Sequence, residues 1–273
     1  MAQTGHVTQA PRAAGPWLSP VTRLRVIIIV TILGVWEAVA ASGILLREVV
    51  PSVVTIGRSL VELLFHPDLK VSLLGRDLSI PAFYWHLTVT ISEVAVALAI
   101  GGLAGLAVGL ALGANPFLAK AFERYFYYLG PTPKIVFFPV MIMWFGVGVE
   151  SKIAMGTVSA FFPLVLSAAA GMRQIEGVLI RVGRSFRLNA WQMVTKIYLP
   201  AMREPIVNGI RLGMGVAMIG TLLAETKLSN KGIGFMIIDA YNTFDMPRMY
   251  AVLLVLFVIA IGANALVGRA SRS

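Results

Sequence analysis

The sequence predicts an all-α polytopic membrane protein, a helix bundle of about six transmembrane helices. Of its 273 residues, 58% are hydrophobic and only 13% are charged, whereas a soluble domain needs roughly 25% charged residues to hydrate its surface. The mean hydropathy is +0.82. The apolar residues also form runs of about 20 residues, the length that crosses the hydrocarbon core of a bilayer. Much of the exterior is therefore expected to face lipid.

Six segments are predicted as transmembrane spans. They are approximately 25–46, 86–113, 122–145, 152–172, 205–225 and 248–268. Residues 1–24 are predicted as a cytoplasmic N-terminal tail, 25–268 as the transmembrane domain, and 269–273 as a C-terminal tail. Pro131, Pro133 and Pro139 interrupt the third span, and two interpretations stay open there. One is a broken helix that faces a pathway, and the other is a simple kink packed against neighbouring helices.

The net charge is +10, and the distribution of the positive charges along the chain predicts its orientation in the membrane. Lys and Arg lie mainly between the apolar runs, a distribution typical of the positive-inside rule. We therefore expect contact with membrane lipid and no nucleic-acid partner. The inner segments hold more Lys and Arg when the N-terminus is placed inside, so both termini are predicted to be cytoplasmic. The chain has no cysteine, and its histidines lack metal-ligand spacing. No catalytic and no metal-binding residue is predicted.

Glycine recurs every four residues in the second span, at Gly101, Gly105, Gly109 and Gly113. That spacing places the glycines along one face of a helix, where a second backbone can approach closely. The pattern predicts a packing surface for another helix.

Several charged residues fall within the predicted spans. Each costs about 2.5–3.5 kcal/mol in hydrocarbon, so each is expected to have a partner or to line a cavity. Glu93, Lys134, Pro139, Arg211 and Glu225 are candidates for a translocation path or gate. Glu225 has an alternative interpretation, an interfacial carboxylate bonded to the following loop. Glu93 is expected to pair with Lys134 or with Arg211.

A basic loop, residues 173–203, separates the fourth and fifth spans and is too long for a simple connector. Apolar residues at near-helical spacing within 182–198 predict a short amphipathic helix around 184–191. Leu199-Pro200 is expected to end it, because the residue before proline disfavours helical geometry. Two roles stay open on composition alone. The helix could lie on the membrane surface, or it could dock into a groove of a partner protein.

This loop resembles the cytoplasmic EAA loop of ABC importer permeases. The Ile-x-Leu-Pro end of that family's pattern matches in full, whereas Arg181 and Arg187 stand where the family has glutamate and glycine. The resemblance implies a coupling helix that contacts an ATPase. The residues that it assigns to this contact are Gly183, Arg184, Ser185, Phe186, Arg187, Leu188, Asn189, Ala190, Trp191, Ile197, Leu199 and Pro200.

Three further stretches resemble the same family, in the same order along the chain. They are Pro139 through Phe145-Gly146, Asn208-Gly209-Ile210-Arg211, and Ala224-Glu225 followed by Gly232-Ile233-Gly234. The branch that the sequence resembles most serves nitrate, sulfonates and taurine. The resemblance implies a type I permease in the cell inner membrane that forms the path for a small organic or inorganic anion, such as a sulfonate, nitrate, taurine or a carboxylate.

The resemblance also implies partners. These are a cytosolic ABC ATPase subunit, a second permease copy or paralogue, and an extracytoplasmic solute-binding protein. ATP would bind the ATPase, and this chain would bind no cofactor and act as no enzyme. The sequence accords with this, since it contains no Gly-x-x-x-x-Gly-Lys-Ser/Thr phosphate loop. An alternative is an ion- or proton-coupled secondary transporter that uses the intramembrane carboxylates Glu37, Glu93 and Glu225.

Overall fold

The computed structural model describes residues 20–43, 49–67, 69–73 and 76–270. Within them, five helices are long and apolar enough to cross a membrane. They are α1 (Pro20–Ser42), α3 (Ala82–Ala114), α6 (Val149–Gln174), α10 (Arg203–Glu225) and α12 (Met246–Ala270). The predicted all-α membrane bundle is confirmed. Residues 1–19 of the predicted N-terminal tail lie outside the described residues, and α12 extends beyond the predicted start of the C-terminal tail.

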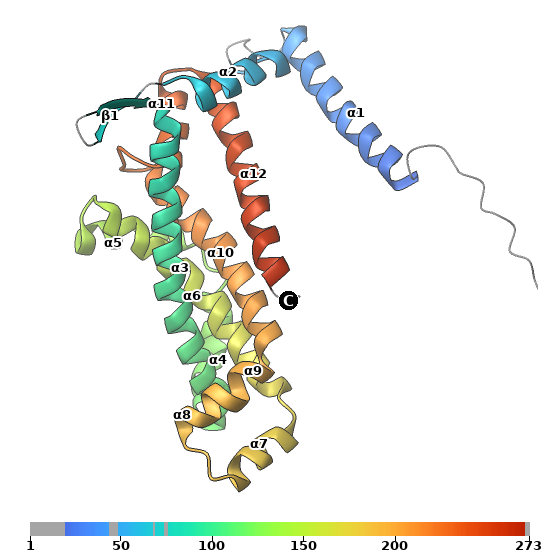
Figure 1. Ribbon diagram of the computed structural model, residues 1–273, viewed down its shortest axis with the longest axis vertical. Coiled ribbons are helices and arrows are strands. Elements are labelled where there is room, and N and C mark those ends of the chain that lie inside the picture. The colour runs from blue at the N-terminus through green and yellow to red at the C-terminus, as the bar shows by residue number, and fades with distance from the viewer. Residues whose placement is uncertain (1–19, 44–48, 68, 74–75, 271–273) are drawn as a thin grey trace, which may run out of the picture.

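Shorter elements cover the two ends of the bundle (Figure 1). One end, called here the cap end, carries α2 (Val53–Phe65), α11 (Ile233–Asn242) and an antiparallel hairpin of β1 (Leu69–Leu73) and β2 (Arg76–Ile80). The opposite end, called here the loop end, carries α7 (Gly177–Ser185), α8 (Ala190–Met193), the π-helix η2 (Val194–Tyr198) and α9 (Leu199–Ala201). The hairpin was not predicted from the sequence.

Helix α3 packs against α6 along the predicted glycine ridge. A Cβ added at Gly105 would lie 2.6 Å from the backbone oxygen of Phe161. A Cβ at Gly109 would lie 2.5 Å from the Cβ of Ala168. The packing role predicted for these glycines is confirmed. Residue numbers rise together on the two helices, so α3 and α6 run parallel, both from the cap end to the loop end.

The chain returns to the cap end between these parallel helices, through α4 (Pro116–Leu129), η1 (Lys134–Phe137) and α5 (Phe138–Phe145). The predicted span over 122–145 is a broken helix, one of the two arrangements left open for it, because the helix is interrupted at residues 130–133. Pro131 and Pro133 lack the backbone N–H that would continue the ladder. The Lys134 ammonium donates to the carbonyl of Gly130 instead, which satisfies an acceptor that lipid cannot.

Helix α10 lies antiparallel to α6, again through glycines. A Cβ at Gly209 would lie 2.8 Å from the Cβ of Ser167, and one at Gly220 would lie 3.0 Å from the oxygen of Met155. Helix α12 runs back toward the loop end. It joins the cap elements in a buried apolar cluster of Leu63, Phe83, Ile233, Met236, Ala251 and Val252.

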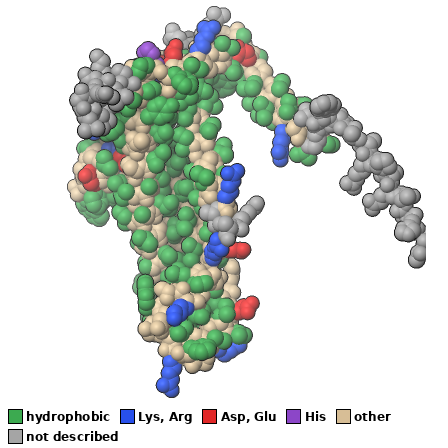
Figure 2. Space-filling model, in the orientation of Figure 1, with side chains coloured by type: hydrophobic (Ala, Val, Ile, Leu, Met, Phe, Trp, Pro, Cys, Tyr) green, Lys and Arg blue, Asp and Glu red, His purple; other side chains and the backbone are tan. Residues whose placement is uncertain are grey.

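Helix α1 projects away from the bundle (Figure 1) and has no buried residue. It is attached near its C-terminal end, where the Trp36 indole donates to the oxygen of Pro51 at 3.0 Å and its ring meets Tyr250 edge-on. The carboxylate of Glu37 accepts from the backbone N–H of Val53 at 2.9 Å. On the face in Figure 2, hydrophobic side chains cover α3 along its length, as expected of a surface that meets lipid.

The close contact of α3 with α6 predicts that Gly109→Ala destabilises the protein. The added methyl group meets Ala168 at 2.5 Å and the oxygen of Val165 at 2.6 Å, so the helices must separate at a cost of about 1–3 kcal/mol. Thermal unfolding in detergent measures the effect. Gly262→Ala on α12 is the control, because a Cβ there has nothing within 4 Å. Equal melting temperatures for the two variants would contradict the packing role.

Candidate functional site

The loop at 173–203 forms two helical segments joined by a turn. Helix α7 ends at Ser185, and α8 starts at Ala190. The predicted amphipathic helix around 184–191 is therefore wrong, since those residues hold the end of one helix, a turn and the start of another. Asn189 starts the second segment. Its side chain accepts from the N–H of Gln192 at 2.8 Å, and the Gln192 side chain accepts from the N–H of Asn189 at 3.0 Å, which is a capping box.

The turn depends on the backbone of Arg187, which has a φ of 51°. This left-handed conformation costs a residue with a Cβ about 1–3 kcal/mol, whereas glycine adopts it freely. Arg187 is the position at which the resembling family has glycine. The structure thus gives a physical reason for the family's glycine, a left-handed turn between the two loop helices.

The helix end predicted at Leu199-Pro200 is one residue early. Helical structure runs through Pro200 and ends at Ala201. Proline cannot donate to the carbonyl four residues back. The π-helix η2 changes the hydrogen-bond spacing just before it, and Leu199 donates to the oxygen of Val194, five residues back. Such π-type turns absorb an irregularity without ending a helix.

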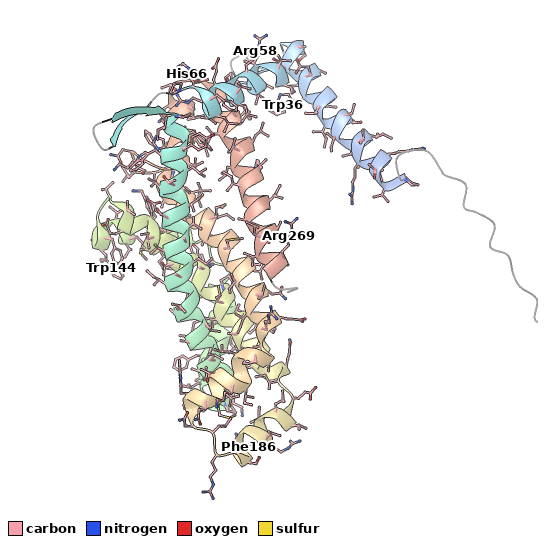
Figure 3. All side chains as sticks on the ribbon, in the orientation of Figure 1. Trp36, Arg58, His66, Trp144, Phe186 and Arg269 are labelled. Atoms are coloured by element: carbon pink, nitrogen blue, oxygen red, sulfur yellow. The ribbon has the colours of Figure 1, made fainter. Side chains whose placement is uncertain are left out.

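Two aromatic side chains project from the loop into solvent. Phe186 is 76% exposed and Trp191 is 73% exposed, and Figure 3 shows Phe186 at the loop end of the molecule. The two loop segments pack on each other at Gly183, where a Cβ would lie 2.5 Å from the sulfur of Met193. The base of the loop joins the bundle core, with Met202 fully buried. Exposed aromatic residues thus stand on a well-anchored scaffold.

A second site lies near the cap end, around Glu225. One carboxylate oxygen accepts from the backbone N–H of Gly234 at 2.6 Å, and the other accepts from the hydroxyl of Thr90 at 2.7 Å. The N–H of Gly232 donates to the ring of His86 at 3.1 Å. Gly232 has a φ of 99°, and a Cβ there would collide with the carboxylate of Glu225. Glu225 therefore fastens the loop that follows α10 onto α3, which supports the interpretation as a carboxylate bonded to its following loop.

Glu93 lies beside Glu225, and one of its carboxyl oxygens is buried without a hydrogen-bond partner. The side chains are 1% and 0% exposed. The cation whose charge acts on both is Lys152. Within the described ranges, no ion pair joins Glu93 to Lys134 or Arg211, so the expected pairing is wrong.

Lys152 is itself held at the start of α6. Its ammonium donates to the oxygens of Val147 and Gly148 at 2.8 and 2.9 Å, and only 3% of the residue is exposed. One buried lysine and two adjacent carboxyl groups thus meet where α3, α6 and α10 converge. Because unpaired buried charge is expensive, this cluster is expected to stabilise one arrangement of the three helices.

The remaining pathway candidates lie elsewhere. Lys134 sits at the break before η1, with its ammonium 5.2 Å from the centroid of the Phe162 ring. Pro139 occupies the first turn of α5, where proline is well tolerated. Arg211 lies beside α12, close to Gly268. The structure thus joins Glu93 with Glu225 and separates the other candidates from them.

Sequence reasoning missed Lys152, Thr90 and His86. Lys152 is the first residue of the predicted span 152–172, so its position in the sequence indicates a charge at the membrane surface. The sequence spacing indicates which helix faces meet. Lys152 and Gly156 are one turn apart on α6, and Thr221 and Glu225 are one turn apart on α10. A Cβ at Gly156 would meet the hydroxyl oxygen of Thr221 at 2.5 Å, so the two pairs face each other.

Comparisons with known proteins identify relatives. A family model described as binding-protein-dependent transport system inner membrane component matches residues 97–273. The putative aliphatic sulfonates transport permease protein SsuC of Bacillus subtilis (strain 168) is 28% identical over 228 residues, 84% of this chain and 78% of that protein. The taurine transport system permease protein TauC of Escherichia coli (strain K12) is 29% identical over 188 residues, 67% of this chain and 68% of that protein.

A solved structure shares the fold. A chain of the MetNI methionine ABC transporter in an inward-facing conformation matches with a TM-score of 0.63 and 19% identity. The match covers 71% of this chain and 98% of that chain. At this identity the likeness concerns the fold alone.

The left-handed turn predicts that Arg187→Gly strengthens the loop. Removing the strain at φ 51° should slow hydrogen exchange of the amides at 186–189 by about fivefold, from a gain of about 1 kcal/mol. Arg184→Gly is the matched control. Arg184 lies within α7, where glycine costs about 1 kcal/mol, so exchange should accelerate. Faster exchange in both variants would contradict the turn geometry.

The carboxyl pair predicts unequal effects of two glutamine substitutions. In Glu93→Gln an uncharged amide of the same shape replaces one of two adjacent buried carboxyl groups, so thermal stability in detergent should change little. In Glu225→Gln an NH₂ group must face either the N–H of Gly234 or the hydroxyl of Thr90, and the lost bond should cost about 1–3 kcal/mol. Equal melting temperatures for the two variants would argue against this arrangement.

Proposed function

The chain belongs to the binding-protein-dependent transport system inner membrane component family, and from this premise we propose how its two ends act in transport. It is the permease subunit of an ABC importer. Its loop end docks a separate cytosolic ATPase subunit through residues 173–203, and its cap end receives solute from an extracytoplasmic binding protein. Both termini then lie in the cytoplasm of a cell bounded by the inner membrane. A second permease copy or paralogue completes the translocation path.

The observation that carries the docking role is the pair of exposed aromatic residues on the anchored loop. Phe186 and Trp191 are held by a capped turn and by buried contacts at the base of the loop. Large aromatic side chains on a preorganised surface are the usual anchors of a protein interface. ATP binding and hydrolysis take place on the partner, and this chain transmits the resulting movement without a cofactor.

The substrate that we propose is a small anion that carries a sulfonate or a similar oxoanion group. The relatives named above are designated for aliphatic sulfonates and for taurine, and both substrates contain a sulfonate group. Uptake of radiolabelled taurine or ethanesulfonate into vesicles with the assembled importer tests the proposal. Stimulation of ATP hydrolysis only by solutes that lack a sulfonate or similar oxoanion group would count against it.

The secondary-transporter alternative receives little support. Its three carboxylates are not arranged as a relay, because Glu37 accepts from Val53 at the junction of α1 and α2. Glu93 and Glu225 lie together instead in the three-helix cluster. Membership of an importer family that works with a binding protein also accounts for the long loop, which a proton-coupled carrier leaves unexplained.

Docking through the loop predicts that Trp191→Ala disrupts the complex. When the chain is co-expressed with the ATPase subunit of its own importer and purified through a tag, the substitution should weaken association at least about 30-fold. Trp144→Ala is the matched control, because Trp144 on α5 is 72% exposed and lies away from the loop end (Figure 3). The ATPase should co-purify fully with that variant.

Two results would contradict this role. One is full recovery of the ATPase with Trp191→Ala and with Phe186→Ala. The other is solute uptake that continues in vesicles from which the ATPase chain has been omitted.

A further inference from the structure

A pocket of about 420 Å³ opens between α10 and the last turns of α12. It is lined by Arg211, Ile261, Asn264, Ala265, Gly268 and Arg269. The polar lining consists of two guanidinium groups and one amide, and no carboxylate contributes to it within the described residues. Its volume is within the range of small-ligand sites. The pocket thus offers donors to an anion.

Arg211 supplies the strongest reason to expect an anion there. Its Nε is buried and has no hydrogen-bond acceptor. In the part of the chain that the structure describes, neither Arg211 nor Arg269 forms an ion pair. An arginine near lipid is costly when nothing compensates its charge. An anion that accepts hydrogen bonds from both arginines would remove much of this cost.

The pocket lies at the depth of a membrane surface. Arg211 is about 21 Å along α10 from Glu225, and Arg269 is about 34 Å along α12 from Met246, at roughly 1.5 Å per residue. The second length is close to the roughly 30 Å of a hydrocarbon core. Arg269 therefore reaches the headgroup layer on the side of the bundle that carries the loop, and Figure 3 shows it at the end of α12, well short of the loop end itself.

Apolar side chains also line the pocket, namely Ile261 and Ala265 on α12. Ile261 is 69% exposed. A water-borne anion would leave them uncovered, whereas the acyl chains of a lipid would lie against them. We propose that this pocket binds the phosphate of an anionic phospholipid, with Arg211 and Arg269 as the phosphate ligands and Asn264 as a further donor. This inference does not rest on the docking role of the loop.

The test is native mass spectrometry of the full-length protein in a mild detergent. Phosphatidylglycerol and phosphatidylcholine with identical acyl chains are titrated separately. We expect one phosphatidylglycerol to bind about tenfold more tightly than phosphatidylcholine, because only phosphatidylglycerol carries the net negative charge that the two arginines attract. Arg269→Gln should remove most of this preference.

Two further variants make the test specific. Arg25→Gln is the matched control, since Arg25 is an exposed arginine on α1 and should leave the preference unchanged. Arg211→Gln should abolish the preference. Arg269→Gln still carries the test if Arg211→Gln fails to fold, because Arg269 is exposed at a helix end and its substitution leaves the core intact.

Competition with soluble anions distinguishes a lipid-binding pocket from a pocket that binds a free anion. Inorganic phosphate, glycerophosphoglycerol and ethanesulfonate should each displace phosphatidylglycerol only at concentrations at least about 100-fold higher, because they lack acyl chains. The proposal is overturned if phosphatidylglycerol binds no more tightly than phosphatidylcholine, or if Arg269→Gln and Arg211→Gln both keep the full preference. It is equally overturned if one of the soluble anions competes as well as the lipid, which would assign the pocket to a water-borne anion.

Discussion

Helix α3 meets α6 along a row of glycines, and the direction of that contact determines the course of the rest of the chain. Since the two helices run parallel, the segment between them has to cross the membrane in the opposite direction. It does so as α4, η1 and α5, with the freed carbonyl at residue 130 satisfied by Lys134. Helix α10 then lies antiparallel to α6 on its other small-residue face. Close backbone packing thus supplies in lipid the cohesion that apolar burial supplies in water.

Much of this arrangement could be predicted from the sequence, because length, apolarity and glycine spacing are local properties. Five of the predicted spans correspond to long helices with modest changes at their ends. The loop could not be predicted to the same degree. Its apolar periodicity continues across residues 184–191, whereas the helix breaks at a left-handed Arg187. The sequence also signals a helix end at Pro200, whereas the π-type spacing before that residue lets the helix run on to Ala201.

Only part of the site at the cap end, its two carboxyl groups, could be predicted from the sequence, for a similar reason. Charges within spans mark Glu93 and Glu225 as unusual, and the structure brings them together. Charge pairing alone suggested a basic partner from the middle of the membrane. The actual cation, Lys152, comes from the start of α6, where it also holds the turn before that helix. Which buried charges meet depends on the register of three helices, and single-sequence patterns do not contain that register.

The two sites are connected by one continuous helical path. Backbone hydrogen bonds run from the turn at Asn189 through η2 and α9, and they continue across Met202, which donates to Tyr198 and accepts from Ile206. Helix α10 then extends to Glu225. The two bonds at Met202 couple a displacement of the loop to α10, although Pro200 and Pro205 donate no backbone hydrogen bond. The buried carboxyl cluster is where α10 is fastened to α3. A partner that pulls on Trp191 therefore acts on the hydrogen bonds of Glu225, at the opposite end of the molecule.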